Sequence, residues 1–277
     1  MSLPPATAQA IAPLPDGYAD VLGRVVAALD ADRRVVALWL GGSLGRGVAD
    51  AGSDLDLIVT VADHEADDVI AAGAATWAFL EPVVIREIPG TPGCFALTTA
   101  EGLRVDIVLE WELDVAETPY RHRVPVFDRR RTPTPVPVAD EERRTPDVAT
   151  MEAIASEFAR QLAIFPDAVV ARGDWLLGQE AVHNYRTFLY QLYVETNQPL
   201  LPMGVKQWSA KLTAAQRDTL AALPLPAAER AAVIDAMQQV AKVLQAEGRE
   251  LVERAGGVWP QAAVDAGLAR WRASGLV

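Results

Sequence analysis

The chain has 277 residues, of which 51% are hydrophobic and 22% charged, and its formal net charge is −12. This length allows one large domain or two modest ones, and the composition is that of a globular protein, not of a disordered one. The single cysteine, Cys94, excludes an internal disulfide and a cysteine zinc site. No apolar run reaches the roughly 18 residues that span a membrane.

The negative charge is concentrated in the first half of the chain. Residues 1–140 contain 21 Asp and Glu against 11 Arg and no Lys, a net charge of −10, whereas residues 141–277 carry −2. Proteins that bind long nucleic acids usually present a basic face, so we expect no such partner. The acidic half either concentrates cations, as metal ions or a cationic small molecule, or simply keeps an alanine-rich protein soluble. The N-terminus has no basic start and is interrupted by prolines, so we expect no secretory signal and a cytoplasmic protein.

The first half alternates helical and strand patterns. Apolar residues at helical spacing predict helices at residues 16–30 and 62–78. Short apolar and β-branched runs predict strands, two of which are separated by Pro-Gly turns. The predicted strands are residues 35–40, 55–61, 83–88, 95–99, 103–111 and, at an edge of the sheet, 124–127. We therefore expect an α+β domain that contains one mixed sheet with flanking helices.

A change of composition separates this domain from a helical one. Residues 128–137, DRRRTPTPVP, resist regular structure and predict a linker. Beyond them, apolar residues recur at helical spacing to the end of the chain. The predicted helices are residues 148–165, 178–195, 206–212, 227–255 and 259–273. We expect two domains, residues 1–140 and residues 141–277, the second an all-helical bundle that closes a substrate cleft.

A glycine-rich turn follows the first predicted strand. The strand ends in Gly41-Gly42-Ser43. Glycines let backbone amides approach a ligand closely, and amides together with a serine hydroxyl suit phosphate oxygens. The turn is not a P-loop, because no Gly-Lys-Ser/Thr follows it, and a Gly-Gly-Ser turn is common in proteins without a ligand.

Two aspartates begin the second predicted strand. Asp54-Leu55-Asp56 follows Ser43 after a gap of ten residues, and alternate side chains of a strand share a face. Two neighbouring carboxylates at the edge of a buried sheet have raised pKa values unless a cation compensates their charge. Mg²⁺ suits this position, because it prefers a few carboxylates together with phosphate oxygens. The structural alternative is a pair that ends a strand in solvent.

A third aspartate, Asp106, interrupts the apolar run at residues 104–110. An unpaired carboxylate in such a strand is costly, so we expect a partner charge. If this strand lies beside the strand of Asp54 and Asp56, the three carboxylates can hold two Mg²⁺ ions. A salt bridge between Asp106 and an arginine is the structural alternative.

Gly42-Ser43, the gap of ten residues, Asp54-Leu55-Asp56 and a later strand aspartate resemble the nucleotidyltransferase superfamily that includes DNA polymerase β. The fuller string, with Arg46-Gly47 and Ser53, makes residues 38–110 more similar to small bacterial members of that superfamily. These are the aminoglycoside and lincosamide nucleotidyltransferases.

This resemblance implies roles for individual residues. Asp54 and Asp56 bind metal, and Asp106 binds the catalytic metal or activates the acceptor. The resemblance also implies that Gly42, Ser43 and Arg46 hold the nucleotide. In the second half, Asn197-Gln198-Pro199 and Lys206-Gln207-Trp208 resemble a segment of the helical domain of such enzymes, in which a lysine reaches the triphosphate. Lys206 is the candidate for that contact, and a solvated lysine beside a packed tryptophan is the alternative.

The predicted reaction is attack of a hydroxyl group on the α-phosphate of a nucleoside triphosphate, with release of pyrophosphate. We expect AMP as the transferred group, Mg²⁺ as the cofactor, and a small, cationic, aminoglycoside-like acceptor. Glu110 lies four residues along the strand from Asp106, about 13 Å, and is either an acceptor-binding residue or a solvated residue at the edge of the core. A protein acceptor fits the motif as well. A nucleotide sensor without activity is a further alternative, against which the three intact aspartates argue, and the sequence does not reveal the oligomeric state.

Overall fold

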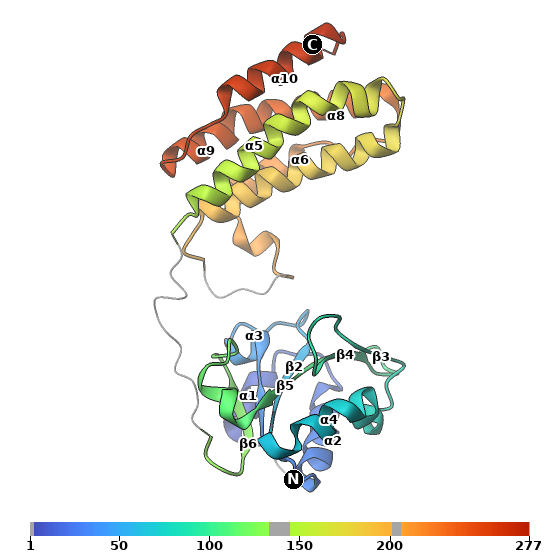
Figure 1. Ribbon diagram of the computed structural model, residues 1–277, viewed down its shortest axis with the longest axis vertical. Coiled ribbons are helices and arrows are strands. Elements are labelled where there is room, and N and C mark those ends of the chain that lie inside the picture. The colour runs from blue at the N-terminus through green and yellow to red at the C-terminus, as the bar shows by residue number, and fades with distance from the viewer. Residues whose placement is uncertain (1–2, 133–144, 201–205, 277) are drawn as a thin grey trace. The chain divides into compact units, whose positions relative to one another are not determined.

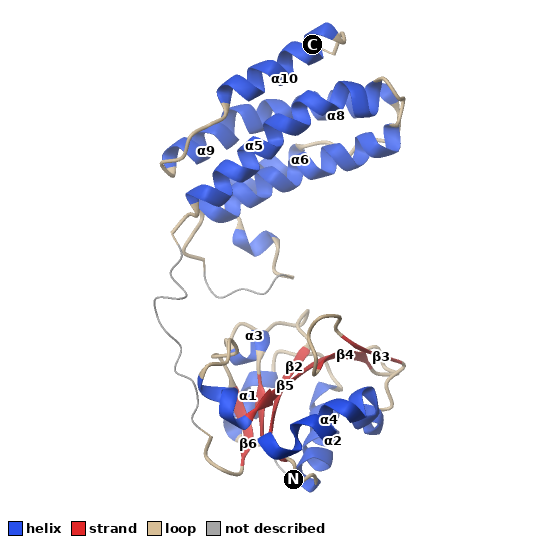
Figure 2. Cartoon of the chain, viewed as in Figure 1, coloured by secondary structure: helices blue, strands red, loops and turns tan. Residues whose placement is uncertain are grey.

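A computed structural model describes residues 3–132, 145–200 and 206–276 of the chain. The chain divides into two compact units, residues 1–138 with 202–206 and residues 139–201 with 207–277. Figure 1 follows the chain through both units, and Figure 2 distinguishes their helices and strands. The domain junction predicted near residue 140, and the second half of the predicted linker, lie outside the described residues.

The first unit is a six-stranded sheet with short helices. Its strands are β1 (Val35–Leu40), β2 (Leu55–Val61), β3 (Val84–Glu87), β4 (Cys94–Thr98), β5 (Arg104–Trp111) and β6 (Val124–Asp128). Its α-helices are α1 (Pro5–Ile11), α2 (Tyr18–Ala31), α3 (Gly42–Gly45) and α4 (Ala66–Ala72). All six strands were predicted within two residues at each end, and β6 lies at the edge of the sheet as expected.

The order of the strands is β3-β4-β5-β2-β1-β6. β2 and β5 are parallel, and every other neighbouring pair is antiparallel. The sheet is therefore mixed, as predicted. The parallel pair is decisive for the site, because it places the start of β5 beside the start of β2.

The two faces of the sheet differ. Leu55, Leu57 and Val59 of β2 point to a face that packs into a core with α2 and the segment around Trp77. The alternate residues of β2 point to the opposite face, where Ile58 packs with Ala37 and Trp39 of β1 in a small separate cluster. Since strand side chains alternate, Asp56 and Thr60 share this second face with Ile58.

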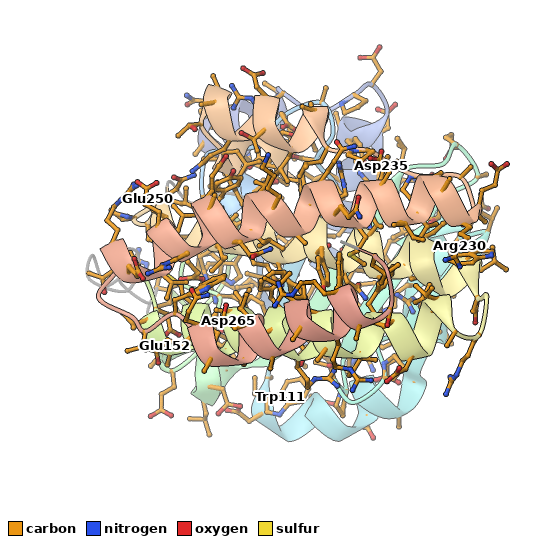
Figure 3. All side chains as sticks on the ribbon, turned by 90° about the horizontal axis from the view of Figure 1, so that it is seen from above. Trp111, Glu152, Arg230, Asp235, Glu250 and Asp265 are labelled. Carbon is orange, nitrogen blue, oxygen red and sulfur yellow. The ribbon has the colours of Figure 1, made fainter. Side chains whose placement is uncertain are left out.

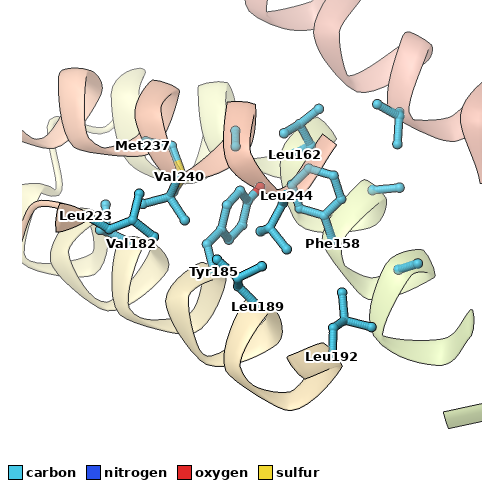
Figure 4. Close-up of a cluster of buried hydrophobic side chains, with 14 of the residues drawn as sticks. Phe158, Leu162, Val182, Tyr185, Leu189, Leu192, Leu223, Met237, Val240 and Leu244 are labelled. Atoms are coloured by element: carbon cyan, nitrogen blue, oxygen red, sulfur yellow. The ribbon is translucent and has the colours of Figure 1, made fainter. Parts of the chain in front are cut away.

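The second unit is all helical, as predicted. Its α-helices are α5 (Val148–Phe165), α6 (Trp175–Thr196), α7 (Ala214–Ala222), α8 (Arg230–Val243), α9 (Arg249–Arg254) and α10 (Gln261–Ala273). Figure 4 shows part of its core, where Phe158 and Leu162 of α5 meet Tyr185 of α6 and Val240 of α8. Exposed carboxylates lie on the outer faces of the helices, for example Asp235 of α8 (Figure 3). The α+β class followed by a helical region is thereby confirmed.

Several predicted helices are wrong in extent. The helix expected at 62–78 is interrupted at Gly73, whose φ of +53° does not fit a helix. The helix expected at 227–255 begins at Arg230 and contains a π-helical turn at Leu244–Gly248. These interruptions are local backbone features that hydrophobic periodicity does not report.

The helix expected at 206–212 is wrong. Only Ser209–Lys211 is helical, as a single 3-10 turn. The next helix, α7, starts after Thr213, whose side chain accepts a hydrogen bond from the Gln216 backbone N–H, and the Gln216 side chain bonds back to the Thr213 backbone. This capping box fixes a new helix start, so the helix lies later in the chain than predicted.

Helix α1 was not predicted. It begins at Pro5, which suits the first turn of a helix. The Thr7 hydroxyl donates a hydrogen bond to the Pro125 carbonyl at 2.8 Å, which ties α1 to the edge strand β6. In the described part of the chain, no helix is both long and apolar enough to cross a membrane.

Candidate active site

The turn after β1 fits closely against β2. The Gly41 N–H donates a hydrogen bond to the Asp56 carbonyl at 2.9 Å. Gly42 has a φ of +51°, and a Cβ at that position would lie 1.8 Å from the Asp56 Oδ2 atom. Only glycine therefore allows the turn and the Asp56 carboxylate to occupy their places together.

The three predicted aspartates come together at this turn. Asp54 immediately precedes β2 and is 8% exposed. In the parallel pairing of β2 with β5, Asp56 stands directly opposite Asp106. The condition on which the three-carboxylate cluster depended, that the two strands are neighbours, is thereby met.

The electrostatics of the cluster are unfavourable for negative charge. Burial, followed by the charges of Asp54 and Asp106, raises the pKa of Asp56 from 3.8 to about 6. Burial and the Asp54 charge also raise the pKa of Asp106. Carboxylates crowded in this way favour a bound cation, which would restore their ionised forms.

A pocket of about 180 Å³ lies over this cluster. Four of the predicted residues line it, namely Gly42, Arg46, Asp56 and Asp106. Ser43 lies on α3 beside it. Among the described residues, the Ser43 hydroxyl and the Arg46 Nε atom are buried and have no hydrogen-bond partner. Buried polar groups normally have partners, so these two are suited to a ligand that supplies acceptors.

Lys206 groups with the first unit. Its ammonium forms a hydrogen-bonded ion pair with the Asp54 carboxylate. The Lys206 side chain is 51% exposed and the Asp54 side chain 12%. The lysine thus supplies part of the positive charge that the carboxylates lack.

Glu110 is buried in an ion pair within the first unit and does not lie on an open surface. Its two carboxylate oxygens accept hydrogen bonds from the Arg123 guanidinium at 2.8 and 2.9 Å. Thr60 donates to the same carboxylate at 3.1 Å, and Glu110 and Arg123 are both buried. Glu110 is thus not the solvated residue that was one of the two expectations, and its role as an acceptor contact stays a prediction.

Sequence reasoning missed one wall of the pocket. Residues Pro119 to His122 line it opposite the glycine turn. A Cβ on Gly45 would lie 2.2 Å from the His122 carbonyl oxygen, so this segment is in close contact with α3. No sequence motif marks this segment. The one available signal is Glu110, a carboxylate within an apolar strand, because such a carboxylate needs a positively charged partner, which is Arg123 next to this segment.

The carboxylates of the cluster are the candidate ligands of a metal ion. Within the described ranges, no group of three or more His, Cys, Asp or Glu side chains is arranged to hold one. The metal site of Asp54, Asp56 and Asp106 therefore stays a prediction. The donor set still fits Mg²⁺, which needs only one or two carboxylates together with phosphate oxygens, and Asp56 and Asp106 lie side by side with uncompensated charge.

Residues 22–114 match the family model "Nucleotidyltransferase domain". A comparison with curated protein sequences finds no match.

Two solved structures are similar at low identity. An aminoglycoside 6-adenyltransferase from Bacillus subtilis is 12% identical over 93% of this chain and 96% of that chain, with a TM-score of 0.39. The cyclic dinucleotide synthase CdnE of Elizabethkingia meningoseptica, with GTP and Apcpp, is 9% identical over 97% of each chain, with a TM-score of 0.28. Both TM-scores are too low to assign a substrate.

Proposed function

We propose that this chain transfers a nucleoside monophosphate to a hydroxyl group of a small molecule. Its residues 22–114 match the nucleotidyltransferase domain, so we infer an enzyme of the nucleotidyltransferase superfamily. The donor is a nucleoside triphosphate, ATP in the first instance, and the reaction depends on Mg²⁺ and releases pyrophosphate. The observation that supports this best is Asp56 directly opposite Asp106, with Asp54 beside them and too little positive charge around them.

Asp54, Asp56 and Asp106 would hold the metal. When bound, Mg²⁺ lowers the pKa of the attacking hydroxyl and neutralises charge on the phosphates. Asp106, ionised beside the bound cation, would accept the proton of the acceptor hydroxyl. The hydroxyl oxygen bonds to the α-phosphorus, the bond from that phosphorus to the bridging oxygen breaks, and pyrophosphate leaves.

Four further residues are proposed to bind the nucleotide. Gly42 lets the turn approach the carboxylates. The Ser43 hydroxyl and the Arg46 guanidinium, each with a buried polar atom that lacks a partner among the described residues, donate to phosphate oxygens. Lys206 already lies against Asp54, and its ammonium would balance triphosphate charge.

A cationic, polyhydroxylated small molecule such as an aminoglycoside is the proposed acceptor. The acidic first half of the chain supports it, because a net charge of −10 concentrates cations near the surface. The same charge disfavours a long nucleic acid as the acceptor.

Transfer of label tests the proposal. The protein is incubated with Mg²⁺, each of the four α-³²P-labelled nucleoside triphosphates and a panel of aminoglycosides and lincosamides. We expect label on at least one drug with the native protein and none with Asp54→Ala. The control is Asp218→Asn, which replaces an exposed aspartate on α7 and should label the drug as the native protein does. Label on a protein band of a cell lysate instead would indicate a protein acceptor, and nucleotide binding without any transfer would indicate a sensor.

A further inference from the structure

Two pockets lie in line along β5, on the face of the sheet that carries the aspartates. The first, of about 180 Å³, lies over Asp106 and Val108. The second, of about 310 Å³, lies over Glu110 and Trp111. Side chains on one face of a strand follow at every second residue, so the second pocket continues the first along the strand. Pro119 and Tyr120 line both.

The backbone of Tyr120 is fixed between the two pockets. Its N–H donates a hydrogen bond to the Thr118 hydroxyl at 3.2 Å. Its carbonyl accepts two hydrogen bonds from the Arg123 guanidinium, at 2.9 and 2.7 Å. Because that guanidinium is itself buried in its pair with Glu110, the position of Tyr120 is set by the interior of the unit.

Tyr120 is 39% exposed and lines both pockets. Burial, and then the charges of Cys94 and Glu110, raise the pKa of its phenol. Tyr120 shares the first pocket with Val108 and the second with Glu110, so it lies where one pocket gives way to the other along β5.

The second pocket offers polar groups to a ligand. Asp114 and Glu117, which line it, are exposed, and Thr118 and Trp111 also contribute to its lining. The two exposed carboxylates accept hydrogen bonds from hydroxyl and ammonium groups.

We propose that Tyr120 determines acceptor specificity, as the side chain that divides the carboxylate pocket from an acceptor subsite over Glu110 and Trp111. This inference rests on the proposed function and adds to it the place where the acceptor lies. The reacting hydroxyl passes the edge of the Tyr120 ring to reach Asp106, so acceptors are selected by how far that hydroxyl extends from the bulk of the molecule. Arg123 is a positioning residue, because it acts through the Tyr120 backbone.

Acceptor discrimination in Tyr120 variants tests the proposal. The probes are the best aminoglycoside of the label-transfer panel and glycerol, a small polyol. In Tyr120→Ala, we expect the ratio of kcat/KM for the drug to that for glycerol to fall at least tenfold, with the KM for the nucleotide within twofold of the native value. Tyr120→Phe keeps the ring and is expected to keep the ratio within threefold. An unchanged ratio in Tyr120→Ala, or a rise in nucleotide KM that accounts for the whole effect, would overturn the inference.

The single cysteine provides a second readout that needs no turnover. Cys94 is 6% exposed and is paired with Val108, which lines the first pocket together with Tyr120. We expect its reaction with Ellman's reagent in the folded protein to be at least tenfold faster in Tyr120→Ala and unchanged in Tyr120→Phe and in Leu113→Ala, an exposed control on the surface. An equal rate in all variants would contradict the placement of the ring. If Cys94 responds as expected but native protein labels no drug, the proposed function fails and the acceptor subsite fails with it.

Discussion

Replacement of Asp56 by Asn should make the metal-free protein more stable. The pKa of Asp56 rises from 3.8 to about 6 on folding, so the folded state binds this proton more tightly than the unfolded state. The stability that the fold gains from binding this proton is therefore fully present below pH 4 and is lost as the pH rises through 6, where the folded carboxyl ionises. At about 1.4 kcal/mol per pKa unit, the ionised carboxylate costs roughly 3 kcal/mol at pH 8. Asn keeps the shape of the side chain and removes the charge.

The assay is thermal unfolding in EDTA at pH 8 and at pH 5. At pH 8 we expect Asp56→Asn to unfold at a temperature higher by roughly 6–12 °C, at about 2–4 °C per kcal/mol. At pH 5 the advantage should fall to about half, because the folded native carboxyl is then mostly protonated while the unfolded one is mostly ionised. The exposed Asp218→Asn variant should not change with pH in this way. Added Mg²⁺ should stabilise the native protein and not Asp56→Asn.

One result would refute the reasoning behind this prediction. If Asp56→Asn were destabilised at pH 8 by as much as at pH 5, the carboxylate would be stabilised by partners within the fold. The cluster would then lack the uncompensated charge from which a metal site was inferred.

Two further substitutions test the geometry around the cluster. Gly42→Ala should lower kcat at least 100-fold, because its Cβ would lie 1.8 Å from the Asp56 carboxylate. Gly47 also has a positive φ, but a Cβ there would meet no atom within 4 Å, so Gly47→Ala should retain activity. Equal losses in the two variants would contradict the steric explanation. Glu110→Gln should lower the free energy of unfolding in urea by about 3–5 kcal/mol, since it leaves a buried arginine unpaired. Glu112→Gln, in a more exposed pair, should cost at most about 1 kcal/mol, and similar costs for the two would be inconsistent with a buried pair.

Much of the fold could be predicted because its signals are local. The strand at 35–40 is a continuous apolar run and that at 55–61 is rich in apolar and β-branched residues, and the structure has both at the predicted residues. Alternation along β2 was enough to place Asp54 and Asp56 at its start. The parallel pairing with β5, which brings Asp106 opposite Asp56, was a conditional inference, since sequence spacing does not specify which strands become neighbours.

The other wall of the pocket could not be predicted, because it depends on tertiary contacts. Tyr120 is placed by hydrogen bonds from Arg123, and Arg123 is placed by Glu110, a residue on a different strand. In the sequence, Glu110 is only a carboxylate in an apolar run, for which an acceptor contact and an ion pair predict the same pattern. Its burial together with Arg123 identifies the ion pair.

The most direct test of the central claim is ³¹P NMR of the reaction mixture, which identifies the bond that breaks. With ATP, Mg²⁺ and an acceptor from the panel, the native protein should form pyrophosphate and a phosphodiester of AMP, and Asp56→Asn should form neither. The appearance of ADP with phosphate on the acceptor, or undiminished pyrophosphate from Asp56→Asn, would contradict nucleotidyl transfer at the three aspartates.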